Sequence, residues 1–380
     1  MKVCFFGTYT RAEGYPVNRV LIKGLRRAGA VVVECRQDLL GPFLYESLRK
    51  WRNPLRLLAL ICRIPATYLK LVWHYWRAED HDCVIVGYAG YVDVLLARVL
   101  RRRRLLVLVA FISLYDTLVL DRDQVKAQSL KGRSLKLVDR LAFKAADVVL
   151  VDTEEQRRHF ASLFDLPVEK FHRSFVGEDD DDFRPMDGEA GDSGTFRVLF
   201  FGTYVPLHGI DVIVDAAALL AAEADICFTV IGNGQLYPAL RRSADERQLS
   251  NLEFVDHWVG TADLMRHIEN ADVSLGIFGT TPKAARVIPY KVFDALAMKK
   301  PVVTRDSPAI REMLTHGETA LLCEPGSGAD LARSLLRLRD DPALRSAIGE
   351  AGYTRYRQNG SPEAVGSALL KMLETKVTSD

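Results

Sequence analysis

The second half of the chain carries closely spaced cations and a carboxylate in an otherwise apolar segment. Lys291 and Asp294 lie three positions apart in a stretch of helical period, so they share one face of the predicted helix 289–298. Lys283 and Arg286 precede them, after a loop of small residues. Such cations can neutralise a diphosphate, and a carboxylate can accept hydrogen bonds from ribose hydroxyls. The alternative interpretation is an ordinary surface ion pair between Lys291 and Asp294.

Glycines at the ends of predicted strands form a second group of candidates. Gly202 ends one strand and Gly209 stands just before the next helix, while Gly232 and Gly234 form a similar turn after the following strand. Gly279 ends the apolar stretch that precedes the cations. Backbone amides in such turns can point at a phosphate, and a helix N-terminus adds partial positive charge. Each glycine, considered alone, is explained equally well by a plain tight turn.

The turn at Gly202 belongs to a string that also opens the chain. Residues 3–9 read VCFFGTY and residues 198–204 read VLFFGTY, so six of the seven positions are identical. In each copy a run of β-forming residues ends at a glycine and a stretch of helical period follows, as in a nucleotide-binding βα unit. The repeat predicts two similar α/β halves that face each other across a cleft. Chance recurrence of a hydrophobic strand is the alternative.

Strands and helices alternate through both halves, which predicts parallel sheets covered by helices. The expected strands lie at 2–7, 31–36, 83–87, 105–112, 147–152, 197–202, 226–231, 252–255, 272–277 and 301–304. The expected helices lie at 17–29, 92–102, 131–146, 210–222, 236–247, 261–269, 289–298 and 308–315, with another starting near residue 154.

These elements divide the chain into domains. We expect a first Rossmann-like domain over 1–176, an acidic linker over 177–195, a second Rossmann-like domain over 196–360 and a C-terminal helix over 361–380. The linker is rich in acids and glycines and poor in aliphatic residues. The last helix begins with an N-cap serine and a first-turn proline, and it is expected to pack back against the first domain.

Composition is ordinary for a soluble two-domain protein. The 380 residues are 48% hydrophobic and 26% charged, with a net charge of +2. The cysteines lack the spacing of a metal site and the acidic run 178–182 lacks that of a calcium loop, so we expect no metal. The N-terminal residues are predicted to form a strand rather than a signal sequence, which indicates a cytoplasmic protein. No module that reads nucleic acid is recognised, so nucleic acid is not an expected partner.

One stretch of the first half is both basic and apolar. Residues 49–77 contain seven cations and three tryptophans and no acid, and a second basic block lies at 98–104. Because Arg63 and Pro65 interrupt the apolar run, a membrane-spanning helix is not expected. The pattern favours a helix lying on an anionic membrane surface, with cations at headgroup level and tryptophan at the boundary. Two amphipathic core helices with solvated basic faces are the alternative.

The second half resembles the donor-binding domain of the family-4 glycosyltransferases, whose two Rossmann-like domains form the GT-B arrangement. The similar stretches occur in order and read FFGTYVPLHGIDVIVDAAALL, FTVIGNGQ, NADVSLGIFG, and VIPYKVFDALAMKKPVV followed by SPAIREML. The linker stretch VGEDDDDFRP also resembles the family, whereas the rest of the first half matches in layout more than in motif. The resemblance implies transfer of a sugar from a UDP- or GDP-linked donor, with retention of anomeric configuration and without a metal or other cofactor.

Two departures affect the donor site that the resemblance implies. The family's acidic motif has two glutamates with seven residues between them; here the first position is Arg286 and the second is the shorter Asp294. The arginine and lysine that usually follow the first glycine are replaced by Thr203 and His208. If the family's reaction is retained, the cations of segment 283–291 are the expected substitutes, because a departing diphosphate needs compensating charge.

Further candidates lie around the predicted cleft. Asp116, which follows a strand end, is expected to contact the acceptor hydroxyl or the sugar, with Arg286 and Lys291 as its catalytic partners. A capping aspartate here, and packed tyrosines at the acceptor-side positions, are equally good interpretations. His257 stands where the family holds the nucleotide base, although a core aromatic residue is the alternative. The expected donor-binding residues are Gly202, Thr203, His208, Gly209, Gly232, Gly234, His257, Gly279, Lys283 and Asp294. The expected acceptor-side residues are Gly7, Tyr9, Tyr15 and Asn18.

The resulting hypothesis is a retaining glycosyltransferase of cell-envelope polysaccharide biosynthesis, which uses a lipid-linked or polysaccharide acceptor on the inner face of the cytoplasmic membrane. A nucleotide-sugar epimerase of the same architecture is one alternative. A non-catalytic protein that binds a nucleotide sugar is another, and the departures at Arg286 and Thr203 keep it open. A dehydrogenase is not expected, because neither half has GxGxxG followed by an acid about twenty residues later.

Overall fold

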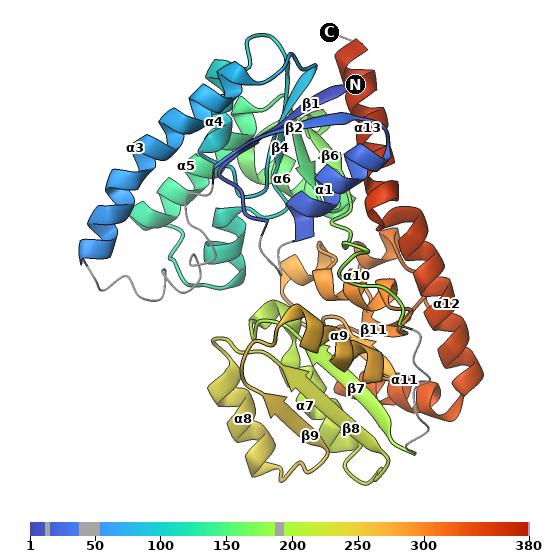
Figure 1. The fold of residues 1–380 in the computed structure, drawn as a ribbon. Coiled ribbons are helices and arrows are strands. Elements are labelled where there is room, and N and C mark those ends of the chain that lie inside the picture. Colours follow the sequence, from blue (N-terminus) through green and yellow to red (C-terminus); the bar gives the residue numbers. More distant parts are fainter. Residues whose placement is uncertain (12–15, 38–53, 187–193, 379–380) are drawn as a thin grey trace.

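The computed structural model describes residues 1–11, 16–37, 54–186 and 194–378, which form two α/β domains joined along one side (Figure 1). Each domain is built on a sheet of six strands, and every strand pair is parallel. Strands such as Val148–Val151 are buried along their whole length, as is typical of a parallel sheet covered on both faces. The predicted pair of Rossmann-like domains is confirmed.

The repeated string forms the first strand of each sheet. The first sheet has the order β2-β1-β3-β4-β5-β6 and the second has the order β12-β11-β10-β7-β8-β9. The strands of the first are β1 Lys2–Gly7, β2 Val31–Arg36, β3 Cys83–Val86, β4 Leu105–Val109, β5 Val148–Val151 and β6 Phe171–Arg173. Those of the second are β7 Phe196–Phe201, β8 Ile226–Ile231, β9 Leu252–Val255, β10 Val273–Leu275, β11 Val302–Arg305 and β12 Leu321–Cys323. Both β1 and β7 lie where the strand order reverses, which is where open α/β sheets bind ligands.

Helices cover both faces of each sheet. The first domain contains α1 Pro16–Arg27, α3 Pro54–Arg77, α4 Asp93–Leu100, α5 Leu130–Ala145 and α6 Glu154–Phe164. The second contains α7 Ile210–Leu219, α8 Tyr237–Glu246, α9 Thr261–Asn270, α10 Tyr290–Ala297, α11 Gly328–Asp340 and α12 Pro342–Asn359, and α13 Pro362–Thr378 follows. Short helical turns are the π-helix η2 Asp116–Asp121 and the 3-10 turns η3 Val168–Lys170, η4 Pro206–His208, η5 Pro282–Ala285 and η6 Ile310–Glu312.

The C-terminal helix returns to the first domain, as predicted (Figure 1). Helix α13 packs against α1 through a close approach of two glycines. A Cβ atom added at Gly24 would lie 2.1 Å from the backbone oxygen of Pro362, and one added at Gly366 would lie 1.9 Å from the carbonyl carbon of Gly24. Neither position can carry a larger side chain without separating the two helices.

The acidic residues of the linker bind the first domain. Lys23 of α1 lies 2.6 Å from carboxylate oxygens of both Asp179 and Asp180, and Arg27 lies 2.5 Å from Asp180. The carboxylates of Asp179, Asp180 and Asp181 lie close together, but their charge is compensated by these α1 cations. We therefore interpret the acidic run as the attachment of the linker to α1.

The predicted helix over 308–315 is wrong. The structure has only the single turn η6 there, followed by a bend around Gly317, which has a φ of +78°. The side-chain hydroxyl of Thr319 accepts a hydrogen bond from the N–H of Thr315, which closes this bend. The segment therefore turns toward β12 before a second helical turn can form.

Helix α3 lies on the first sheet by one face and exposes the other. Thr67, Leu71 and Tyr75 are buried at a spacing of four residues, as expected for one face of a helix. The opposite face exposes Leu69 (71%) and Trp76 (73%). No helix among the described residues is long and apolar enough to cross a bilayer.

Candidate functional site

Loops of the second domain meet at the carboxyl ends of the adjacent strands β7 and β10. Gly202, with a φ of +147°, ends the strand at β7, and Gly209 precedes α7. A Cβ atom at Gly209 would lie 2.3 Å from the backbone nitrogen of Gly279, which follows β10. The predicted glycines are therefore brought together, and in the structure they allow backbones to pack directly on each other.

Lys291 of α10 points its ammonium group at the Gly202 turn. A Cβ atom at Gly202 would lie 2.7 Å from Lys291 Nζ, and Nζ lies 4.0 Å from the centre of the Phe200 ring. The lysine is buried, and its Nζ has no hydrogen-bond partner among the described residues. Burial therefore lowers the pKa of Lys291 well below its ordinary value, although nearby Asp294 opposes this shift.

His208 lies beside this ammonium group and is partly buried. Its Nδ1 is hydrogen-bonded to the carbonyl oxygen of Thr203. This hydrogen bond spans the loop after β7 and joins the two residues that stand where the resemblance predicts an arginine and a lysine. Burial and the charge of Lys291 lower the pKa of His208 well below its usual range. Because the imidazole is neutral, the cation that faces the Gly202 turn is Lys291 of α10.

Asp294 lies one helical turn after Lys291 and is buried. Its Oδ1 has no hydrogen-bond partner within the part of the chain that the structure describes. Its carboxyl group is hydrogen-bonded to that of Glu178 in the linker. Burial raises the pKa of Asp294 to about 7, and burial together with Asp294 raises the pKa of Glu178 well above its usual value.

Asp116 of the first domain is bound by cations of the second. Its Oδ1 lies 2.8 Å from a guanidinium nitrogen of Arg286, and its Oδ2 lies 3.3 Å from Lys283 Nζ. His159 Nε2 is 2.9 Å from the same Oδ1. Burial would raise the pKa of Asp116, but the hydrogen bond with His159 and the charges of Lys283 and Arg286 outweigh it and lower the pKa to about 2. The carboxylate therefore stays ionised.

Further contacts around Asp116 join the two domains. Lys283 Nζ donates to Thr117 Oγ1 at 2.6 Å, and Thr281 Oγ1 donates to Asp121 Oδ1 at 3.0 Å. The carboxylate of Glu312 accepts hydrogen bonds of 2.9 and 3.0 Å from the first N–H of α6. Two of the three expected phosphate-binding cations thus bind the first domain in this structure, whereas Lys291 lies at the predicted phosphate turn.

The corresponding turn in the first domain contains a carboxylate. A Cβ atom at Gly7 would lie 2.7 Å from Asp93 Oδ2, and that oxygen accepts a 2.6 Å hydrogen bond from the backbone N–H of Thr8. Tyr68 donates to the other oxygen at 2.8 Å. Copies of the same string therefore face opposite charges, with Asp93 at Gly7 and Lys291 at Gly202.

The other acceptor-side candidates that the structure describes form hydrogen bonds within the first domain. The hydroxyl of Tyr9 donates to Glu34 at 3.0 Å. Asn18 is buried; its Oδ1 accepts from the N–H of Tyr88 at 2.7 Å and its Nδ2 donates to Thr10 at 3.1 Å. Tyr15 lies outside the described residues.

The remaining donor-side candidates lie at neighbouring loops. A Cβ atom at Gly232 would lie 2.2 Å from the oxygen of Gly202, and one at Gly234 would lie 2.6 Å from backbone atoms of Tyr204. His257, just after β9, is exposed, so the structure does not place it in the core. An exposed imidazole there is accessible to a ligand.

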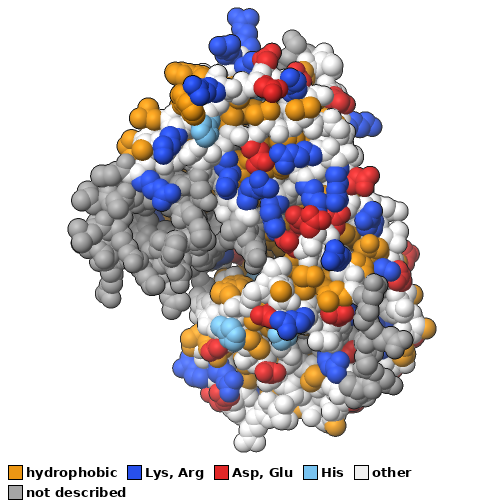
Figure 2. All heavy atoms as spheres, viewed as in Figure 1, with side chains coloured by type: hydrophobic (Ala, Val, Ile, Leu, Met, Phe, Trp, Pro, Cys, Tyr) orange, Lys and Arg blue, Asp and Glu red, His pale blue; other side chains and the backbone are white. Residues whose placement is uncertain are grey.

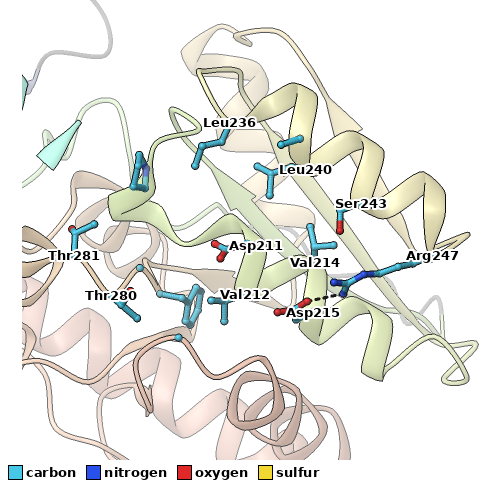
Figure 3. Close-up of a pocket in the computed structure, with 15 residues that line it drawn as sticks. Asp211, Val212, Val214, Asp215, Leu236, Leu240, Ser243, Arg247, Thr280 and Thr281 are labelled. Carbon is cyan, nitrogen blue, oxygen red and sulfur yellow. Dashed lines mark hydrogen bonds and ion pairs between the residues drawn. The ribbon is translucent and has the colours of Figure 1, made fainter. Parts of the chain in front are cut away.

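A pocket between α7 and α8 borders the loop that contains Gly279 (Figure 3). It has a volume of about 580 Å³. Asp211, Val212 and Val214 of α7 face Leu236 and Leu240 across it. We do not place the reaction here, because its lining includes neither Lys291 nor Asp294 and its one cation, Arg247, is paired with Asp215 at 2.6 Å.

Sequence reasoning missed several residues of this region. His159 lies on α6 in a helical stretch without a motif, and Glu178 was assigned to a solvated linker. Asp152 follows β5, is buried, and has its pKa raised to about 7 by burial. A buried carboxylate at a strand end is the one signal that could have identified Asp152.

The basic apolar surface predicted on the first domain continues onto α4 and α5, and its second basic block is partly paired with acids. Residues 49–53 lie outside the described residues, and Figure 2 shows hydrophobic and basic side chains side by side along the described part of α3. Arg98 and Arg101 share Asp147, and Arg104 pairs with Asp80, so two aspartates compensate part of the charge of the five arginines in block 98–104. Apolar side chains are also exposed on the neighbouring helices α4 and α5, namely Val92, Leu95, Val99, Leu130, Leu137, Val138 and Leu141.

Comparisons with known proteins agree with this geometry. Residues 195–341 match the model of the family described as glycosyl transferases group 1. The α-D-kanosaminyltransferase of Streptomyces kanamyceticus is 25% identical over 62% of this chain and 62% of its own length. A D-inositol 3-phosphate glycosyltransferase of Pseudarthrobacter chlorophenolicus is 29% identical over 44% of this chain and 40% of its own length. The chain thus spans about half the length of such curated relatives.

Solved structures show the fold over the whole chain. HepE of Anabaena, in complex with UDP, has a TM-score of 0.69 at 17% identity, covering 99% of this chain and all of that one. The sucrose-phosphate synthase of Thermosynechococcus elongatus has a TM-score of 0.69 at 15% identity and covers both chains fully. The arrangement of the two domains is the GT-B fold of glycosyltransferases.

Proposed function

We propose that this chain is a group 1 glycosyltransferase that moves a sugar from a UDP- or GDP-linked donor with retention of anomeric configuration. The observation that carries the proposal is the pair Lys291 and Asp294, which lies at the reversal point of the second sheet with an unpartnered ammonium and an unpartnered carboxylate oxygen. The match to group 1 glycosyltransferases covers this same domain. HepE, which shares the fold, was solved with UDP and with UDP-glucose.

Lys291 is proposed to bind the diphosphate at the Gly202 turn. A buried ammonium without a partner is unfavourable, and an anionic ligand removes that cost by restoring charge compensation. Its charge also stabilises the departing nucleoside diphosphate when the bond to the sugar breaks. Because side-chain cations supply this charge, we propose that no metal or other cofactor is needed, so transfer should be undiminished in chelator.

Asp116 is proposed to act on the sugar or acceptor side of the cleft. It is fully buried beneath Lys283, which lies in η5, and Arg286, which caps the end of η5. A bound diphosphate would compete with Asp116 for these cations and would thereby uncover the carboxylate. With a pKa of about 2, Asp116 is suited to stabilise positive charge or orient a hydroxyl, not to donate a proton.

The acceptor is proposed to be lipid-linked or a polysaccharide, reached at the inner membrane surface through α3. The exposed Leu69, Trp73 and Trp76 lie among cations on this helix, and α3 contains no acid. The acids of α4 and α5, Asp93 and Asp139, are both buried, so their exposed faces are apolar and basic. This combination is typical of helices that bind anionic lipid surfaces.

Calorimetry with UDP and GDP tests the donor site. Replacing Lys291 by Met keeps the side chain's length but removes its charge, and should weaken binding at least tenfold. Lys299→Met is the matched control, since this lysine follows the same helix and pairs with Glu350 on the surface. Binding to wild type should also take up a proton at pH values above the lowered pKa of Lys291, because a nearby anion favours the protonated form of the amine.

The same experiment separates an enzyme from a simple binder. Hydrolysis or transfer of the bound nucleotide sugar, with the product's anomer determined, identifies a retaining transferase. Binding without turnover under any acceptor condition would support the non-catalytic alternative. If neither nucleotide binds wild type, or if Lys291→Met binds as wild type does, the proposed donor site is incorrect.

A further inference from the structure

The linker carries a buried carboxyl group that reaches the donor site. Glu178 is only 2% exposed, and its side chain is hydrogen-bonded to the carboxyl group of Asp294. Its backbone is also held, because its N–H donates to Gly360 at 3.1 Å and its carbonyl accepts from the Tyr356 hydroxyl at 2.9 Å. An ionised carboxylate has no donor, so a hydrogen bond between two carboxyl groups requires that one of them carry a proton.

The hydrogen bond leaves one oxygen of Asp294 available. Oδ1 is buried and has no partner among the residues described here, and Lys291 lies one turn away on the same helix. Aspartate is one methylene shorter than the glutamate that the family resemblance leads us to expect at this position. Glu178 therefore places a second carboxyl group beside Asp294, whose side chain does not extend as far as a glutamate at this position would.

We infer that Glu178 is a positioning residue of the donor site, which holds the Asp294 carboxyl group through a shared proton and thereby directs Oδ1 toward the ribose hydroxyls. This inference rests on the proposed function. One negative charge is spread over two side chains, so Asp294 can accept hydrogen bonds without a full second charge being buried. The charged and titratable groups facing the pair are Arg19 from α1, Lys291 and Tyr290 from α10, Tyr356 from α12 and the neighbouring Asp179 of the linker.

The shared proton can be tested without any nucleotide. Infrared difference spectra of wild type minus Glu178→Gln, and of wild type minus Asp294→Asn, should show a protonated carboxyl band at neutral pH; the contribution of buried Asp152, whose pKa is about 7, cancels in both differences. Glu350→Gln, a change at an exposed glutamate of α12, is the control and should leave the band unchanged. Difference spectra that lack this band for both variants would show that no proton is shared and would overturn the inference.

The positioning role is tested by UDP affinity. Glu178→Gln keeps a hydrogen-bond donor to Asp294 and should bind within about threefold of wild type, but its affinity should change less between pH 6 and 8, because only the titrations of Lys291 and of the nucleotide's own phosphate remain. Glu178→Ala should bind about tenfold more weakly, and its thermal unfolding shows whether the fold is retained. Wild-type affinity and pH dependence in both variants would contradict the role, even if the infrared band behaves as expected. If wild type itself binds no nucleotide, the proposed function fails, while the infrared result still decides the shared proton.

Discussion

Single residues determine where an anion is stabilised in this molecule. The cations at 283 and 286 are already compensated by Asp116, so binding a diphosphate there requires that existing ion pairs be broken. Lys291 has no such partner among the described residues, and burial raises the pKa of its nearest acid, Asp294, to about 7, so that this acid is only partly ionised near neutral pH. Binding an anion should therefore release more free energy at Lys291 than at Lys283 or Arg286.

Replacing Asp294 by Ala should weaken nucleotide binding by roughly 1.5–3 kcal/mol, the range for hydrogen bonds that involve a charged group. The reason is loss of the ribose contact at Oδ1. Calorimetry with UDP measures the change, and a 2′,3′-dideoxy nucleotide should bind wild type and variant equally. Unchanged affinity for UDP would remove Asp294 from the ribose site.

Many residues of the candidate site could be predicted from the sequence, but the contacts that these residues make with distant parts of the chain could not. The types and spacing of Lys291 and Asp294 predict that they share a helix face, because that depends only on the helical period. The contact of Asp294 with Glu178 depends on how the linker crosses between domains. The contact of Asp116 with Arg286 joins residues 170 positions apart, and no local pattern records it.

At the scale of elements, the carboxyl-end loops are positioned by strands that the sequence predicts closely. Strands β2, β8 and β9 have the predicted bounds, because runs of β-branched and aromatic residues between turn residues define them well. The helix expected at 308–315 failed because a side-chain hydrogen bond of Thr319 closes a bend that helical periodicity does not reveal. Helix α3 was predicted from its composition. Which of its faces is buried depends on how it packs on the sheet, and composition does not show that.

Helix α3 should make the protein adsorb to anionic vesicles. Each engaged cation contributes on the order of 1 kcal/mol, and the exposed tryptophans add apolar burial. Replacing Trp73 and Trp76 by Ala should lower co-sedimentation at physiological salt, whereas Trp258→Ala, an exposed tryptophan of the second domain, should not. Equal pelleting of wild type with neutral and anionic vesicles would refute membrane attachment.

At the scale of the whole molecule, titratable groups at the domain interface couple stability to pH. Asp152 lies near Lys283 and Glu312, and burial raises its pKa to about 7. The folded state therefore binds this proton more tightly than the unfolded state does. As pH rises from about 4 to about 7, the unfolded chain ionises first and the folded state loses stability.

Asp152→Asn should abolish this loss. Relative to the variant, wild type should lose on the order of 3 kcal/mol of unfolding free energy between pH 4 and pH 7, at about 1.4 kcal/mol per unit of pKa difference. Urea unfolding at several pH values measures it, with Asp245→Asn on the surface of α8 as the control. Parallel pH profiles for wild type and Asp152→Asn would show that this carboxyl group titrates normally.

The two copies of the repeated turn face side chains of opposite charge, so the two domains are not equivalent as binding sites for an anion. Asp93 fills the turn at Gly7 and Lys291 faces the turn at Gly202, although the two strings differ at one position. The proposed donor, a nucleotide sugar, would therefore have one favourable orientation, with its phosphates on the second domain and its uncharged sugar toward the first. Backbone geometry alone would allow either half to bind it, so the asymmetry of the proposed reaction would be encoded by side chains that lie outside the repeat.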